Sequence, residues 1–238
     1  LEDVKRFWES GVLNPDSNVQ FGEGGAGTFS DGKLNTLIKD SGGRNRKVLE
    51  IFVENGAPND ILYMNKPHIG TELLTDIVKN MRLKIIAWGG EVRFHAKVTD
   101  MSIKHNSIHE LVINDTERIS CKVAILAIGH SARDTFQMLS DRGVNMEAKS
   151  FAVGVRIEHL QKMVNQVQYG FTPYKLPPAS YKLTAKTDDQ RGVYTFCMCP
   201  GGYVVNASSE KGMLAVNGMS YHSRSGTNAN SAVIVTVT

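Results

Sequence analysis

The stretch from Phe21 to Thr36 constrains this chain more than any other, because it carries glycine at positions 22, 24, 25, 27 and 32. Each glycine inside a helix or a strand costs roughly 0.5–1 kcal/mol relative to alanine, so the stretch is predicted to be a loop. A backbone without side chains can approach another group closely, and its amides can surround an anion. A tight loop with a purely structural role fits this composition equally well.

Three of these glycines, Gly22, Gly24 and Gly27, match the pattern G-x-G-x-x-G. The pattern binds a dinucleotide where a buried strand precedes it and a helix opens at its end. Here the residues at 14–20, N-P-D-S-N-V-Q, are typical of a turn, and T-F-S-D-G-K follows the glycines. We therefore reject a nucleotide fingerprint at this position.

The bulk properties exclude several classes of partner. The 27 Lys and Arg residues nearly balance 24 Asp and Glu residues in the 238-residue chain, and this net charge of +3 argues against a nucleic-acid partner. The longest apolar runs are too short to cross a bilayer, so no membrane association is expected. Three cysteines cannot form a disulfide framework, and a cytoplasmic location is expected. The chain starts with Leu1 and stops within a predicted strand, which indicates a piece of a longer protein.

The spacing of apolar residues separates a helical part and a strand part within the first half of the chain. Apolar residues at helical spacing predict helices over 3–10, 48–53 and 73–81, with glycines 11, 56 and 89 as their stops. From Glu91 the period changes to two, which predicts an antiparallel meander at about 91–120, with turns at 104–107 and 114–117.

A different signal follows the meander. The run V-A-I-L-A-I at 123–128 is apolar without alternation, as expected of a strand buried on both faces of a parallel sheet. Gly129 then makes a turn, and Ser131 with Asp134 predicts a capping box at a helix start. Free amides at such a start suit a phosphate or a ring edge. An ordinary connection between a strand and a helix is as consistent with the pattern.

The region after residue 150 is predicted to be rich in strands. Alternation over 151–157 predicts one strand, with Arg156 and Glu158 on its opposite face. Shorter strands are expected at 181–185, 193–198, 203–206 and 214–217, with a Pro-rich connection at 171–178, an irregular block at 217–231 and a last strand after it. The predicted fold class is α/β: a sheet-and-helix domain over 1–149 with the meander inserted, and a β-rich α+β domain over 150–238.

Six segments together resemble one group of proteins. They are F-G-E-G-G-A-G-T-F-S-D-G-K-L-N-T, K-P-H-I-G-T, L-A-I-G-H-S-A-R-D-T-F, F-A-V-G-V-R-I-E-H, C-M-C-P-G-G and N-G-M-S-Y-H-S-R-S-G-T-N-A-N-S-A. In this order they are similar to a bacterial family of largely uncharacterised FAD-dependent dehydrogenases, whose FAD domain is of the glutathione-reductase and hydroxybenzoate-hydroxylase type. The resemblance extends over almost the whole chain.

The resemblance implies a flavin site and a substrate domain. It places two groups of residues beside FAD, one in the glycine stretch and one at the turn after the apolar run, and it makes residues 150–238 the substrate domain. The implied cofactor-binding residues are Gly24, Gly25, Ala26, Gly27, Ser30, Asp31, Lys33, Ala127, Gly129 and His130. Both groups are expected to converge on one flavin pocket.

This chain also departs from the family pattern. Members of the family carry a true dinucleotide fingerprint upstream of the region matched by 3–8 and a second glycine-rich flavin contact beyond the segment matched by 232–238, and neither is present here. We therefore expect this polypeptide not to hold FAD tightly by itself.

Other polar residues have more than one interpretation. Arg156, His222 and Arg224 are candidates to receive an anionic substrate, since guanidinium groups suit carboxylates, although they also fit ordinary surface charges. The pair Cys197 and Cys199 lacks two further soft ligands, so we favour structural cysteines and expect no metal site. His68 fits a packed histidine or a ligand contact.

The leading functional prediction is a flavin-dependent dehydrogenase fragment that moves a hydride from an unidentified small-molecule substrate to FAD. In such enzymes the cofactor performs the chemistry, and the protein orients and tunes it. The alternative is a non-catalytic module that recognises a ligand or a partner through the irregular block at 217–231.

Overall fold

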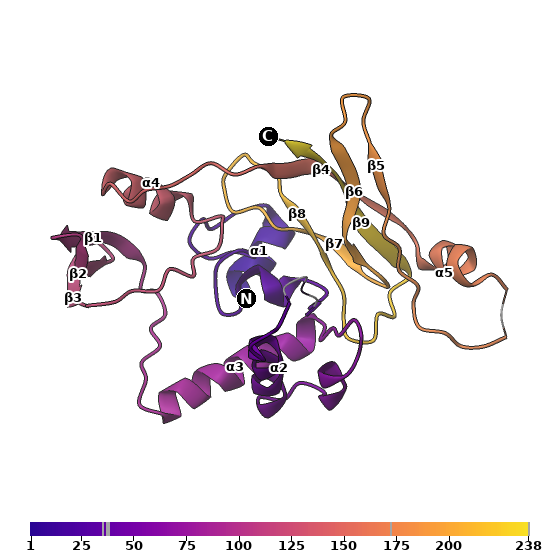
Figure 1. The fold of residues 1–238 in the computed structure, drawn as a ribbon, viewed down its shortest axis with the longest axis horizontal. Coiled ribbons are helices and arrows are strands. Elements are labelled where there is room, and N and C mark those ends of the chain that lie inside the picture. The colour runs from indigo at the N-terminus through magenta and orange to yellow at the C-terminus, as the bar shows by residue number, and fades with distance from the viewer. Residues whose placement is uncertain (35, 37–38, 172, 238) are drawn as a thin grey trace. The chain divides into compact units, whose positions relative to one another are not determined.

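A computed structural model describes residues 1–34, 36, 39–171 and 173–237 and divides the chain into two compact units (Figure 1). One unit combines Leu1–Ala87 with Ser150–Thr238, and the other is Trp88–Lys149. Three positions in the predicted segments, Asn35, Thr172 and Thr238, lie outside the described residues. The domain division expected from the sequence, 1–149 and 150–238, stays a prediction.

The first helix of the larger unit, α1 (Glu2–Ser10), confirms the helix expected at 3–10. It ends because Gly11 adopts a left-handed conformation with φ 74°, from which its N–H reaches the Phe7 carbonyl. The buried faces of Val4 and Phe7 point inward, and Val4 joins a small core with Val19.

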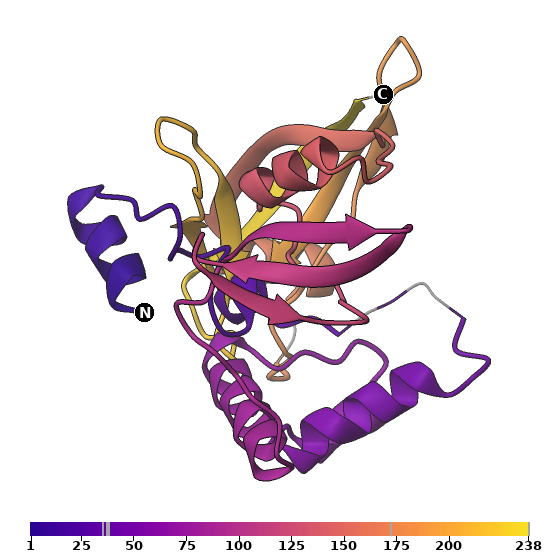
Figure 2. The ribbon, with the colours of Figure 1, turned by 90° about the vertical axis from the view of Figure 1, so that its left-hand side faces the viewer.

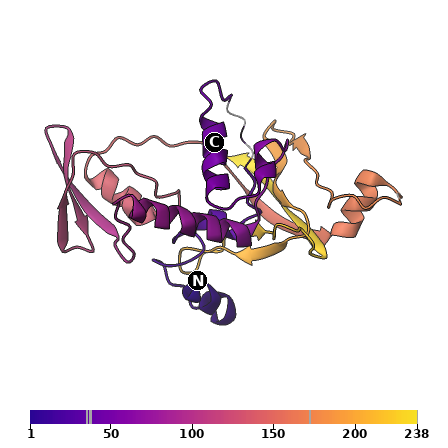
Figure 3. The same ribbon diagram turned by 90° about the horizontal axis from the view of Figure 1, so that it is seen from below.

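Two longer helices form the main core of this unit. The helix α2 (Arg44–Glu54) begins earlier than the predicted residue 48, and α3 (Thr71–Ala87) contains the predicted 73–81. Figure 3 shows the two helices crossing steeply. Around the crossing, buried aliphatic residues and the short helix η2 (Asn59–Leu62) close a core built on Ala57, Ile61, Ile69 and Ile77. Removing such side chains from water is the main favourable term here.

A four-stranded antiparallel sheet is the main sheet of the second half. Its strand order is β4 (Phe151–Leu160), β9 (Asn228–Val237), β6 (Gly192–Cys199) and β5 (Thr184–Lys186). A two-stranded sheet pairs β7 (Tyr203–Asn206) with β8 (Val216–Met219). The last strand of the chain is thus central in the large sheet, and the predicted β-rich character is confirmed.

Two features of this half differ from simple expectation. The helix α5 (Gln161–Tyr169) was not predicted, because Val164 is its one buried apolar residue and the pattern around it is weak. The alternation in β4 is as predicted, but its apolar face is exposed: Phe151, Val153 and Val155 are 63, 56 and 66 % exposed. On the opposite face Ala152 and Arg156 are partly buried, whereas Glu158 is exposed, and Arg156 donates a hydrogen bond to Asn230.

The smaller unit contains the predicted antiparallel meander (Figure 2). Its strands are β1 (Val98–Lys104), β2 (Ser107–Ile113) and β3 (Glu117–Ser120), paired in sequence order. The two predicted turns are present, and the first strand starts at Val98 rather than near residue 92. The helix α4 (Arg133–Asp141) follows the strands. Helices with antiparallel sheets confirm the mixed α/β class.

The strand predicted at 123–128 is wrong in this structure. Val123, Ile125 and Leu126 are 79, 89 and 51 % exposed, and these residues pair with no strand among the described residues. An unalternating apolar run forms a strand only where neighbouring strands and layers cover both of its faces. The capping box is wrong as well, because the N-cap of α4 is Ala132, which has no side-chain acceptor.

None of the helices in the described ranges is long and apolar enough to span a membrane.

Candidate functional site

The first residues of the glycine stretch form an exposed turn, and its last residues are buried. Gly24 and Gly25 have φ values of 82° and 53°, and they lead into the short 3₁₀ helix η1 (Gly25–Phe29). The residues before Thr28 are largely accessible, whereas Thr28, Asp31 and Gly32 are buried. The turn therefore presents backbone at the surface and is fixed at its far end.

The buried end of the glycine stretch, from Asp31 to Leu34, pairs with the segment K-P-H-I-G at 66–70. Ile69 donates its N–H to the Gly32 carbonyl at 2.9 Å, and Leu34 donates to the Pro67 carbonyl at 3.0 Å. A Cβ on Gly32 would lie 2.8 Å from the Gly70 nitrogen, so glycine is required by this close backbone contact. Two segments that the sequence singled out for separate reasons are thus adjacent.

Asp31 lies at the centre of a buried ionic cluster. Its carboxylate, 2 % exposed, accepts hydrogen bonds from the Arg224 guanidinium through both oxygens, with Nε to Oδ1 at 2.9 Å. The Lys33 ammonium lies 3.1 Å from Oδ2, and the Ser220 hydroxyl donates to Oδ1. One acid therefore holds two cations and a hydroxyl from segments far apart in the sequence.

The cluster keeps Asp31 ionised. Burial alone would raise the pKa of Asp31, but the hydrogen bonds from Arg224 and the charges of Lys33 and Arg224, with help from Ser220, lower it below the ordinary value. A fully satisfied carboxylate of this kind acts as an anchor, because its oxygens already have partners.

A pair of stacked histidines lies beside this cluster. The rings of His68 and His222 have centroids 5.2 Å apart and an interplanar angle of 19°. His68 donates through Nε2 to the His222 carbonyl at 3.0 Å, and His222 donates through Nδ1 to the Ile69 carbonyl at 2.9 Å. Because carbonyls only accept, these bonds fix the proton positions in both rings. Burial lowers the pKa of His68.

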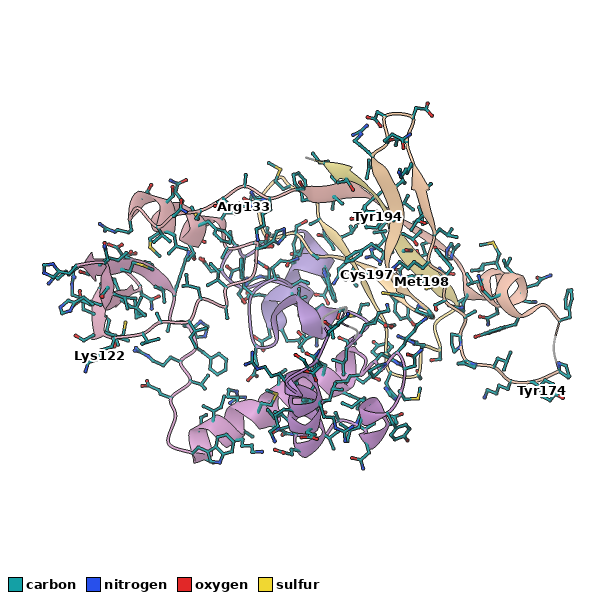
Figure 4. The ribbon with its side chains drawn as sticks, in the orientation of Figure 1. Lys122, Arg133, Tyr174, Tyr194, Cys197 and Met198 are labelled. Carbon is teal, nitrogen blue, oxygen red and sulfur yellow. The ribbon has the colours of Figure 1, made fainter. Side chains whose placement is uncertain are left out.

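Lys33 and Arg156 donate hydrogen bonds to backbone carbonyls at the end of β6, where Figure 4 labels Cys197 and Met198. The Lys33 ammonium donates to the Met198 carbonyl, and Arg156 Nη1 donates to the Cys197 carbonyl at 3.2 Å. The pairing of β6 with β9 is irregular here, and Cys197 has a left-handed φ of 46°. Such bulges redirect a strand locally. All three cysteines are free, and burial raises the pKa of the Cys199 thiol.

The larger unit thus brings together many of the predicted site residues. Asp31, Lys33, Arg224 and His222 lie in or beside one cluster, and Arg156 reaches the strand end that Lys33 also holds. Ser30 faces its own loop, since its hydroxyl donates to the Gly27 carbonyl. Gly24, Gly25, Ala26 and Gly27 belong to the turn that precedes it.

The other predicted residues, Ala127, Gly129 and His130, belong to the smaller unit. All three are accessible: Ala127 lies within the exposed apolar run and the other two follow it, and Gly129 has a φ of 66°. Their expected convergence with the glycine stretch stays a prediction.

Sequence reasoning missed several members of the cluster. Ser220 and Asn230 are each 0 % exposed, and Glu72 accepts a hydrogen bond from the His222 backbone at 2.8 Å. The first two stand inside the polar block 217–231, where nothing distinguishes a buried polar residue from a solvated one. Groups of three or more potential metal ligands do not occur within the described part of the chain.

Comparison with known proteins connects part of this chain with flavoproteins. Residues 150–238 match the family model described as "FAD-dependent protein, C-terminal domain-like". Over 239 aligned residues, 99 % of this chain is 52 % identical to an uncharacterized protein of Clostridium beijerinckii, and the alignment covers 44 % of that protein. The chain therefore spans less than half the length of this relative. The family match supports an association of residues 150–238 with FAD-dependent proteins.

Proposed function

We propose that this chain is the central and substrate-domain portion of a FAD-dependent oxidoreductase that transfers a hydride from a small-molecule substrate to the flavin. One observation carries the proposal: the glycine stretch, the segment at 66–71, the end of β6 and the block at 217–231 form one continuous cluster around Asp31. The family match of residues 150–238 supports the choice of FAD.

The residues present fit such a cofactor. The turn at 22–27 offers accessible backbone with few side chains, and a Cβ on Gly24 would lie 2.3 Å from Thr28 Cγ2. The Lys33 side chain, in the same glycine stretch, is 31 % exposed, and its ammonium lies 3.1 Å from Asp31 Oδ2. Backbone donors and one cation suit a ligand that carries phosphates and a polar ring edge.

In this proposal the backbone of Gly24, Gly25, Ala26 and Gly27 binds the cofactor, and Lys33 faces its polar edge. Ser30 and Asp31 shape the turn, because both already have partners within the chain. Ala127, Gly129 and His130 supply a second contact segment. When bound, FAD supplies the two-electron acceptor. The chain's own residues orient the ligands and exclude water from them.

The test is a chimera in which residues 1–238 replace the aligned span of the Clostridium beijerinckii relative. We expect the purified chimera to retain flavin and candidate hydride donors to bleach its absorbance under anaerobic conditions. Lys33→Met is expected to weaken FAD retention, whereas Lys182→Met, at an exposed lysine of the same unit, is not. The 238-residue chain alone is expected to purify without stoichiometric flavin.

A folded chimera that is colourless and resists reconstitution with FAD contradicts the proposal. That result favours the non-catalytic binding module. The block at 217–231 would then be the recognition segment, although His222 and Arg224 already bind within the chain, and Ser220 is buried there.

A further inference from the structure

Arg156 differs from the two neighbouring cations in lacking an acidic partner. Lys33 and Arg224 both form ion pairs with Asp31. Arg156 donates through Nη1 to the side-chain oxygen of Asn230 at 2.6 Å and to the Cys197 carbonyl at 3.2 Å, and both acceptors are neutral. No acid among the described residues forms an ion pair with it. A partly buried guanidinium without a counter-ion is costly unless an anion joins it.

The same pair of side chains leaves two buried donors unused. Arg156 Nε and Asn230 Nδ2 have no hydrogen-bond partner in the described part of the chain, and Asn230 is 0 % exposed. The amide of Asn230 is oriented by its own bond, since Oδ1 accepts from Arg156. Leaving a buried donor unpaired costs about 1–3 kcal/mol, and natural proteins seldom tolerate it without a reason.

The backbone around the pair is shaped to accommodate it. A Cβ on Gly218 would lie 2.3 Å from Arg156 Nη1 and 2.4 Å from Asn230 Oδ1. Cys197 holds its carbonyl toward the guanidinium from a left-handed conformation that non-glycine residues seldom adopt. The site therefore includes a required glycine, a strained residue and a buried amide.

We propose that Arg156 and Asn230 form the receptor for an oxyanion of the carboxylate or phosphate type. An arginine fork presents paired N–H groups that match two oxygens of such an ion. Of the three candidates from the sequence, Arg224 already pairs with Asp31 through Nε and Nη2, and His222 Nδ1 already donates to the Ile69 carbonyl. The proposed function supplies the two sources of the ion, a carboxylate on the substrate or a phosphate of the cofactor.

The test follows the arginine side chains of the 15N-labelled 238-residue chain by NMR. The Nε–H signals of Arg156 and Arg224 are assigned from Arg156→Lys and Arg224→Lys and are titrated with acetate, inorganic phosphate or chloride at equal ionic strength. We expect a saturable shift of the Arg156 signal, with a dissociation constant of about 1 mM or tighter, and little change for Arg224. Saturation by acetate assigns the site to the substrate, and saturation by phosphate alone assigns it to the cofactor.

A second variant keeps the site testable if substitutions of Arg156 unfold the chain. Asn230→Asp places an acid beside Arg156 at nearly unchanged volume, and it is expected to weaken anion binding by about tenfold or more. The matched control is Asn165→Asp, which adds the same charge on α5, where Asn165 Oδ1 already accepts from Gln161 and the Ala179 N–H.

An absent or unsaturable shift of Arg156, or an equal shift of Arg224, overturns the proposal and leaves buried water as the partner of these donors. Because the assay contains no flavin, its failure is separate from that of the proposed function. If the chimera holds FAD but the Arg156 signal does not shift, the proposed function is retained and the anion site at Arg156 is rejected.

Discussion

Asp31 is the residue on which the cluster depends, because its carboxylate binds Arg224, Lys33 and Ser220 at once. Asp31→Asn leaves two cations without their anion. We expect a loss of about 3 kcal/mol in the free energy of unfolding, measured by urea denaturation, because one partner of a buried pair is removed. Asp189→Asn is the control: it breaks an exposed pair with Arg191 and is expected to cost less than about 1 kcal/mol. Equal losses in the two variants would contradict the role of Asp31.

Asp31 also determines how the stability of the fold changes at acidic pH. The pKa of Asp31 is lower in the folded chain than in the unfolded one, so its ion pairs stabilise the fold above about pH 4. This contribution is lost as the pH falls further.

His68 governs the pH dependence in a higher range. Burial lowers the pKa of His68, so the folded chain favours the neutral ring above about pH 6.5 and loses stability as the pH falls below that value. The charges around the ring are those of Arg224, Asp31 and His222. We expect His68→Gln, which can still donate to the His222 carbonyl, to flatten the decline of unfolding free energy between about pH 7 and pH 5. If the unfolding free energy of His68→Gln declines as steeply as that of the parent chain, other groups cause the decline. His109→Gln, at an exposed position of β2, should leave the decline unchanged.

At the scale of elements, close backbone contact joins the start of α3 to the block 217–231. A Cβ on Gly70 would lie 2.3 Å from the His222 nitrogen. Gly70→Ala is therefore expected to force the two segments apart. Gly89 is a matched control, because both glycines have a φ of 86° but a Cβ on Gly89 would meet nothing within 4 Å.

Both alanine variants carry the cost of a left-handed conformation, about 1–2 kcal/mol. We expect Gly70→Ala to lose a further 2 kcal/mol or so through overpacking, measured by thermal and urea unfolding. If the two variants lose the same free energy of unfolding, the segments at Gly70 and His222 separate without cost.

Elements with a local cause were predictable from the sequence, and elements with a tertiary cause were not. The helix at 2–10 and the meander follow from period and turn residues, which act within a few positions. The run at 123–128 was assigned to a buried strand because of its composition, yet burial depends on neighbours that composition does not supply. Likewise, α5 has Val164 as its one buried apolar residue, too little for a periodic signal.

For the site, the sequence supplied the segments but not their contacts. The glycine stretch, His68, His222 and Arg224 were all singled out beforehand. Asp31 pairs with Arg224, and Arg156 has no acidic partner among the residues that the structure describes; both facts depend on the packing of distant segments. Pair contacts across nearly two hundred residues leave no local trace in a single sequence.

At the scale of the whole molecule, the division into two units makes a direct prediction. All members of the Asp31 cluster lie in Leu1–Ala87 and Ser150–Thr238. Replacing Trp88–Lys149 by a long flexible linker should therefore keep the Arg224 Nε–H signal and slow hydrogen exchange at Ile69. A chain cut after Lys149 lacks Ser220 and Arg224 and should lose the slow exchange. Loss of both signals in the linker variant would show that the cluster requires the smaller unit.

The ion pair between Asp31 and Arg224 joins residues that are 193 positions apart. During translation at roughly 5–20 residues per second, the acid is synthesised about ten to forty seconds before its partner. Throughout that interval the carboxylate must stay hydrated, so the segment around Asp31 cannot complete its packing. The segment that carries Arg224 therefore decides when the carboxylate of Asp31 can become buried.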